Sequence, residues 1–92
     1  MKKISEAELR ELLKEYREKE LEIKLEGVIS GNIHIDKLAF VITSNKMIFI
    51  DEKEGITEIK IETFMVYSIL FNEKRKTIEI KLDNDENIRL DL

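Results

Sequence analysis

The sequence predicts an α+β fold, with one N-terminal helix followed by a small antiparallel β-barrel or sandwich of about seven to eight strands. Apolar residues recur at helical spacing near the N-terminus, and from about residue 20 onward they alternate with charged residues. Turn residues interrupt this alternation about every ten residues, as in small all-β domains. The 92 residues suit a single domain, 1–92, with the helix over about 6–19 and the β-barrel over about 20–92.

The helix is predicted by its start signal and by its apolar stripe. Ser5 and Glu8 have the spacing of a capping box, in which each side chain accepts a hydrogen bond from the backbone N–H of the other residue. The apolar residues that follow form one narrow stripe: Leu9, Leu12, Leu13 and Tyr16. Because such a stripe is stable only when it is buried, we expect the helix to dock on the sheet.

The strand region begins at Glu20, where the apolar period changes from helical to two. Strict alternation, as in 20–26 and 77–83, predicts strands with one buried and one solvated face. Turn residues separate the predicted strands at 30–32, 44–45, 51–55, 72–76 and 84–87.

Three segments, 38–42, 47–50 and 64–71, are apolar on both faces, and strands of this kind are normally covered on both faces. If the strand that starts at Thr57 continues without a bulge, four residues of the third segment point inward: Met65, Tyr67, Ile69 and Phe71. Three others then point outward: Phe64, Val66 and Leu70. We expect these three to form a surface that either the helix stripe or a partner protein covers.

The residues that usually carry chemistry are sparse. There is no cysteine, and the single histidine, His34, lies on the polar face of its segment without neighbouring cysteine or histidine ligands, so we expect a surface residue. Asp83, Asp85 and Asn87 have the initial spacing of a calcium-binding EF-hand loop, but Ile88 occupies its glycine position and favours a solvated turn. The sequence therefore predicts no enzyme, no cofactor and no metal.

Charge and hydropathy restrict the possible partners. The net charge of −4 makes nucleic acid an unexpected partner, and the basic segment 73–76 is interpreted as a solvated turn. No apolar run is long enough to span a membrane. A charged helix follows the N-terminal lysines at the place where a signal peptide would be apolar, so we expect a cytoplasmic protein.

The composition is rich in Lys and Glu and contains no Gln, which fits a thermophile or an AT-rich genome equally well.

The segment 40–92 resembles the core of bacterial pleckstrin-homology-like and GRAM-like domains. The matching residues are Thr43, Asn45, Lys46, Ile48 and Phe49, then Tyr67, Ser68 and Ile69, then the hairpin 77–92. The resemblance implies a barrel that is closed by a C-terminal helix and a site for lipid headgroups. This chain ends on a predicted strand, so its N-terminal helix is expected to take the place of the closing helix. The first hairpin lacks the basic residues that binding of phosphoinositides needs.

The N-terminal half is also similar to the opening of Sm-like proteins, in which a capped helix precedes the first strands. Gly27, Gly31 and Asp36 match, and Asn45 is the nearest candidate for the base-binding residue. This resemblance implies rings that form through strand edges and bind RNA. The closing hairpin of this chain exceeds the five-strand core of that family.

These observations favour a non-catalytic binding module that acts through protein–protein contacts, as an adaptor or a protein inhibitor. A protein partner or self-association is expected, and no small-molecule substrate is inferred. Two alternatives stay open, namely a ring-forming, RNA-binding Sm-like protein and a lipid-headgroup-binding module.

Overall fold

The computed structural model describes residues 1–27, 30–53 and 58–92, and the predicted start of a strand at Thr57 lies outside these ranges. The α+β class is confirmed, because one short α-helix accompanies antiparallel strands in two sheets. The helical elements are α1 (Glu6–Leu13) and two 3₁₀ turns, η1 (Lys14–Tyr16) and η2 (Thr63–Met65). The strands are β1 (Lys2–Lys3), β2 (Leu21–Glu26), β3 (Gly31–Ile35), β4 (Leu38–Ile42), β5 (Lys46–Asp51), β6 (Glu58–Glu62), β7 (Val66–Asn72), β8 (Thr77–Leu82) and β9 (Asn87–Asp91).

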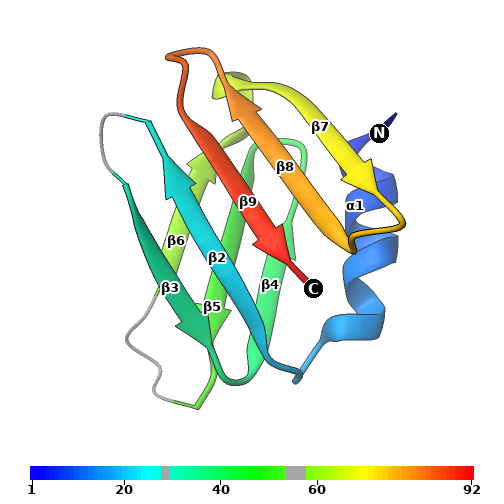
Figure 1. Cartoon of the computed structure of the whole chain (residues 1–92), viewed down its shortest axis with the longest axis vertical. Helices are drawn as coiled ribbons and strands as arrows, with labels where there is room; N and C mark the ends of the chain where they lie inside the picture. Colours follow the sequence, from blue (N-terminus) through cyan, green and yellow to red (C-terminus); the bar gives the residue numbers. More distant parts are fainter. Residues whose placement is uncertain (28–29, 54–57) are drawn as a thin grey trace.

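The larger sheet has the strand order β1-β7-β8-β9-β2-β3, and the smaller sheet has the order β4-β5-β6. Figure 1 shows the larger sheet in front of the smaller one, with α1 beside them. Neither β3 and β4 nor β6 and β7 pair with each other, so the described residues form two sheets and not a closed barrel. Gly31 and Asn32, predicted as turn residues, belong to β3, where they pair with Leu25 and Lys24.

The capping box predicted at the start of α1 is confirmed. The backbone N–H of Glu8 donates to Ser5 Oγ at 3.1 Å, and the N–H of Ser5 donates to Glu8 Oε1 at 3.2 Å. The helix is shorter than predicted, because α1 ends at Leu13 and continues only as the turn η1. Glu18 then adopts a positive φ of 68° and donates its N–H to the carbonyl of Leu38, which ties the turn before β2 to β4.

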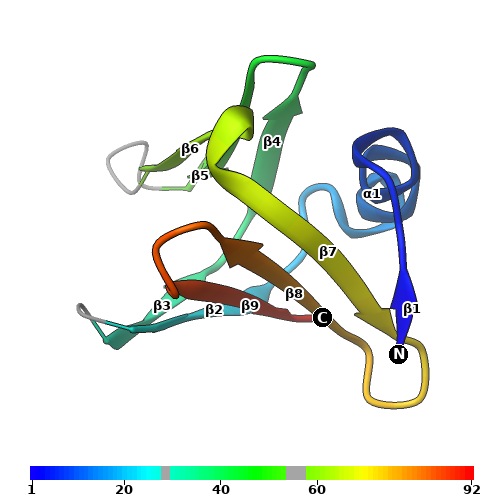
Figure 2. The ribbon, with the colours of Figure 1, turned by 90° about the horizontal axis from the view of Figure 1, so that it is seen from above.

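The helix lies at the side of the core between β4 and β7, as Figure 2 shows. Leu9 and Leu13 are fully buried in the same hydrophobic core as the inward side chains of both sheets. The Arg10 guanidinium donates to the carbonyl of Ile42 in β4 at 3.2 Å, and the N–H of Ile4 donates to the carbonyl of Ile69 in β7 at 2.9 Å. The helix therefore packs into the core between the edges of the two sheets.

The segment that leads into β7 is not the regular strand that its sequence predicts. The turn η2 precedes β7, and a bulge between Val66 and Ser68 shifts the register with β8. As a result Tyr67, predicted to be in the core, is 74% exposed. Val66, predicted to point outward, packs against the core instead. A bulge adds one residue to one strand of a pair and so reverses the faces of the residues beyond it.

The two sheets are joined at a corner between β3 and β4, where the chain leaves one sheet and enters the other. Asp51, at the end of β5, is only 2% exposed and accepts three backbone hydrogen bonds at this corner. The donors are the N–H groups of Asp36 and Lys37 at 3.2 Å and of Lys53 at 3.1 Å. Burial raises the pKa of Asp51, but the N–H donors outweigh it and hold the pKa below its ordinary value of 3.8.

Candidate functional site

The outer faces of the two sheets differ in chemistry. The outer face of the larger sheet is mostly charged, and its ion pairs include Lys24 with Asp91 at 3.7 Å and Arg89 with Asp91 at 3.0 Å. The inner face of the smaller sheet supplies the buried side chains of Phe40, Ile42, Met47 and Phe49. The alternate residues of β4 and β5 point to the outer face of the smaller sheet. They are apolar too, because both strands are apolar on both faces.

Four aliphatic side chains form a block on this outer face, which we term the aliphatic patch: Ala39, Val41, Ile48 and Ile50. The strand register pairs Ala39 with Ile50 and Val41 with Ile48, so that the four lie two by two on adjacent strands. Val41 is 44% exposed, and the other three are partly exposed. On β6 the patch is bordered by exposed residues of both charges: Glu58, Lys60 and Glu62.

The three residues predicted to share one outward surface do not lie together. Phe64 is 79% exposed in η2, Val66 packs against the core, and Leu70 is partly exposed on the outer face of the larger sheet. The neighbours of Leu70 across the strands are the charged residues Lys3 and Glu79. Of the predicted helix stripe, Leu9 and Leu13 are buried, and Leu12 and Tyr16 are partly buried against the core.

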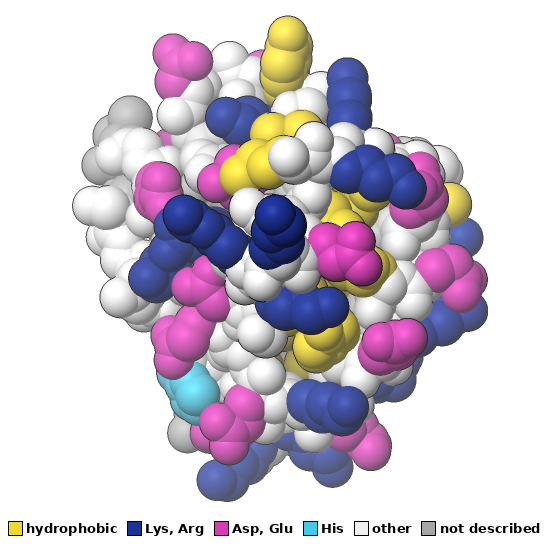
Figure 3. Space-filling view, turned by 45° about the vertical axis from the view of Figure 1, so that its right-hand side comes forward, with side chains coloured by type: hydrophobic (Ala, Val, Ile, Leu, Met, Phe, Trp, Pro, Cys, Tyr) yellow, Lys and Arg dark blue, Asp and Glu magenta, His cyan; other side chains and the backbone are white. Residues whose placement is uncertain are grey.

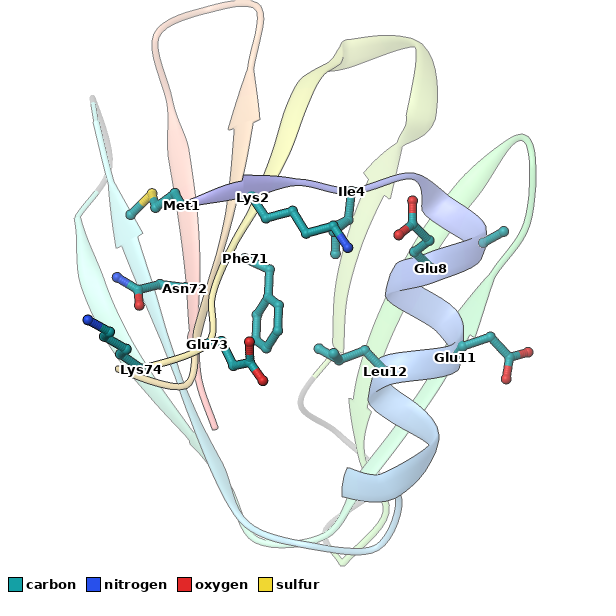
Figure 4. Close-up of a pocket in the computed structure, with 11 residues that line it drawn as sticks. Met1, Lys2, Ile4, Glu8, Glu11, Leu12, Phe71, Asn72, Glu73 and Lys74 are labelled. Atoms are coloured by element: carbon teal, nitrogen blue, oxygen red, sulfur yellow. The ribbon is translucent and has the colours of Figure 1, made fainter.

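An open groove of about 1040 Å³ lies between the N-terminal segment, α1 and the turn after β7 (Figure 4). Apolar side chains of Ile4, Leu12 and Phe71 line it. Its charged lining residues carry both signs: Lys2, Glu8, Glu11, Glu73 and Lys74. The groove thus combines a small apolar surface with both positive and negative charges.

Exposed cations lie on the two segments that border this groove. Lys2 and Lys3 pair with the end of β7, and the turn that follows β7 carries the basic segment singled out in the sequence. We term this group the basic corner: Lys2, Lys3, Lys74, Arg75 and Lys76. Figure 3 shows the face on the side of α1, where hydrophobic side chains lie in separate patches between Lys, Arg, Asp and Glu.

His34 is surrounded by carboxylates, which sequence reasoning missed. The β2–β3 register places His34 opposite Glu22, and the same alternation carries Glu20 and Asp36 to this face. The imidazole Nδ1 contacts Glu22 Oε1, while Nε2 lies 3.1 Å from Asp36 Oδ1 and 3.7 Å from Glu20 Oε2. The hydrogen bond with Glu22 raises the pKa of His34 above its ordinary value. Figure 3 shows the histidine beside acidic side chains.

The register of the β2–β3 hairpin is the information that is needed to predict this cluster. Residues that face each other across β2 and β3 have numbers that sum to the same value, so pairing Glu22 with His34 also sets Glu20 opposite Asp36. The sequence predicts both strands, but it does not fix which residues are opposite. The cluster is therefore visible only once the register is known.

Compared with protein-family models, with curated proteins and with solved structures, the chain matches none. The resemblances to pleckstrin-homology-like and Sm-like proteins therefore stay expectations drawn from short motifs. No helix in the described part of the chain is both long and apolar enough to cross a membrane.

Proposed function

We propose that this chain is a non-catalytic binding module that acts through protein–protein contacts, and that the aliphatic patch is its contact surface. The observation that supports this proposal is the exposure of Val41, 44%, within a block of four aliphatic side chains on one sheet face. Burying such surface is favourable by about 25 cal/mol per Å². A β-sheet face of this kind packs well against a second apolar sheet face at a distance of about 10 Å.

The partner that the patch fits best is a second copy of this chain. A two-fold dimer needs only one patch, because the same surface serves both subunits. The bordering residues Glu58, Lys60 and Glu62 carry both charges, and Lys60 lies within 3.9 Å of Glu62 in the same strand. A border of mixed sign is able to complement itself across a two-fold axis, whereas a border of one sign repels its own copy.

Charging the patch is expected to dissociate this dimer. Val41→Lys and Ile48→Lys each place an ammonium group where the apolar contact forms, and the cost of burying it opposes association. The measurement is sedimentation velocity over a range of protein concentrations, with circular dichroism to show that each variant is folded. We expect the unsubstituted chain to associate and both variants to stay monomeric at the same concentrations.

The matched control is Leu70→Lys, which makes the same change at a partly exposed leucine on the outer face of the other sheet. This variant should associate like the unsubstituted chain. A chain that is monomeric at every concentration contradicts self-association through the patch. Equal loss of association in Leu70→Lys and Val41→Lys would show that the contact is elsewhere.

A second candidate function, the binding of lipid headgroups, is favoured by the basic corner alone. Anionic lipids attract clustered Lys and Arg by about 1 kcal/mol per cation near the surface, and salt weakens this attraction. We expect the chain to pellet with vesicles that contain phosphatidylserine at low salt and not at high salt. Lys74→Gln together with Lys76→Gln should reduce pelleting, whereas Lys60→Gln, on β6, should not. Pelleting that is unaffected by the double substitution would exclude the corner as the contact.

A further inference from the structure

The acidic cluster around His34 draws three metal-binding groups together at one end of the β2–β3 hairpin. The Nε2 atom of His34 and one carboxylate oxygen each of Glu20 and Asp36 all lie within 4.8 Å of one another. Glu20 directly precedes β2 and Asp36 directly follows β3, so two strands and their register fix the arrangement. The side chains are accessible from solvent, with exposed fractions of 46% for His34, 73% for Glu20 and 35% for Asp36.

The contact of Nδ1 with Glu22 decides which nitrogen of His34 faces the other two carboxylates. An ionised carboxylate only accepts hydrogen bonds, so the Nδ1 of His34 donates to Glu22 Oε1. In the protonated imidazole Nε2 donates to Asp36 Oδ1, 3.1 Å away, and loss of that proton leaves a lone pair that faces the oxygens of Asp36 and Glu20. A metal cation takes the place of that proton, so that three electron-pair donors then surround the cation. A carboxylate on the far nitrogen is also the usual support of a metal-binding histidine.

The spacing of the three donors suits a small transition-metal ion. Zinc binds nitrogen and oxygen ligands at about 2.0–2.2 Å, which in tetrahedral geometry separates two ligands by about 3.3–3.6 Å. The two separations from Nε2, 3.1 and 3.7 Å, lie on either side of this range. Imidazole together with carboxylate suits zinc, whereas magnesium prefers a shell of oxygen ligands alone.

We propose that Glu20, His34 and Asp36 bind a divalent transition-metal ion, with zinc preferred to magnesium, and that Glu22 is a positioning residue that orients the imidazole. Water fills the remaining coordination positions, because the site is at the surface. Lys53, whose Nζ lies 4.0 Å from Asp36 Oδ2, offsets part of the negative charge without blocking Nε2. A bound ion would tie the segment before β2 to the corner after β3.

The test is a titration of the chain with zinc chloride at pH 7.5, followed by isothermal calorimetry and by NMR of the His34 ring. We expect one binding site per chain, shifted ring signals, and no comparable response to magnesium. His34→Asn and Asp36→Asn each remove a ligand and should weaken zinc binding at least about tenfold. Glu22→Gln should weaken it about 10- to 100-fold while all three ligands stay in place.

Glu79→Gln is the matched control, because it removes a carboxylate from the outer face of the same sheet on a strand that does not pair with the hairpin. It should bind zinc like the unsubstituted chain. Thermal unfolding without metal establishes that each variant is folded. The proposal is overturned if zinc leaves the His34 signals unchanged, if His34→Asn binds zinc with unchanged affinity, or if Glu22→Gln and Glu79→Gln behave alike.

Discussion

Replacing Leu13 with alanine should lower the free energy of unfolding by about 3 kcal/mol. Leu13 is fully buried in the core that both sheets share, and its loss leaves a cavity that the neighbouring side chains fill only in part. The helix segment is tied to β7 by the N–H of Ile4 and to β4 by Arg10, so it does not collapse freely into the space. Urea denaturation followed by circular dichroism measures the loss.

The matched control is Leu12→Ala, one residue earlier in the same helix. Leu12 is only partly buried and also lines the open groove, so we expect its substitution to cost about 1 kcal/mol. Leu9→Ala should behave like Leu13→Ala, because Leu9 is fully buried as well. Equal small losses in all three variants would contradict the placement of the helix in the core, and so would an unchanged stability when all three leucines become serine.

Replacing Asp51 with asparagine should destabilise the domain at neutral pH and flatten its response to acid. The amide has one acceptor oxygen and an NH₂ group, so it leaves N–H donors of the β3–β4 corner without a partner. Because the pKa of Asp51 is lower in the folded state, its contribution is present above its ordinary value of 3.8. It is lost as the pH falls through the folded pKa.

Thermal unfolding between pH 2 and pH 7 measures this effect. The unsubstituted chain should lose stability steeply at the acidic end, and Asp51→Asn should lose less there because it has no carboxylate to protonate. Glu52→Gln is the control, since Glu52 is exposed and adjacent in sequence. If Asp51→Asn has the same melting temperature and the same acid response as the unsubstituted chain, Asp51 does not hold the corner together.

Local patterns predicted the elements better than their arrangement. The cap at Ser5 and the buried Leu9 and Leu13 follow from spacing within one turn of helix, which the sequence displays directly. Alternation likewise identified the inward residues of β2 and β8. These features depend on neighbours along the chain, and distant contacts did not override them.

The features that the sequence did not reveal depend on distant contacts. The bulge in β7 follows a turn held by bonds to remote loops: the N–H of Thr63 donates to Asn45 O, and the N–H of Asp83 donates to Met65 O. Nothing in the run 64–71 itself marks the bulge, so the alternation predicts the faces of Tyr67 and Val66 the wrong way round. The aliphatic patch is consistent with the strands that are apolar on both faces, but which face stays exposed depends on which face packs toward the larger sheet.

The strand order of the larger sheet also has a consequence for biosynthesis. β9 lies between β8 and β2, so the sheet joins the last described strand to one of the first. β4, β5 and β6 pair only with sequence neighbours and are able to associate early, whereas β2 and β8 each keep an open edge until β9 has left the ribosome. Unpaired edges attract other chains. Before β9 inserts, a nascent chain therefore exposes two strand edges through which other chains are able to pair with it.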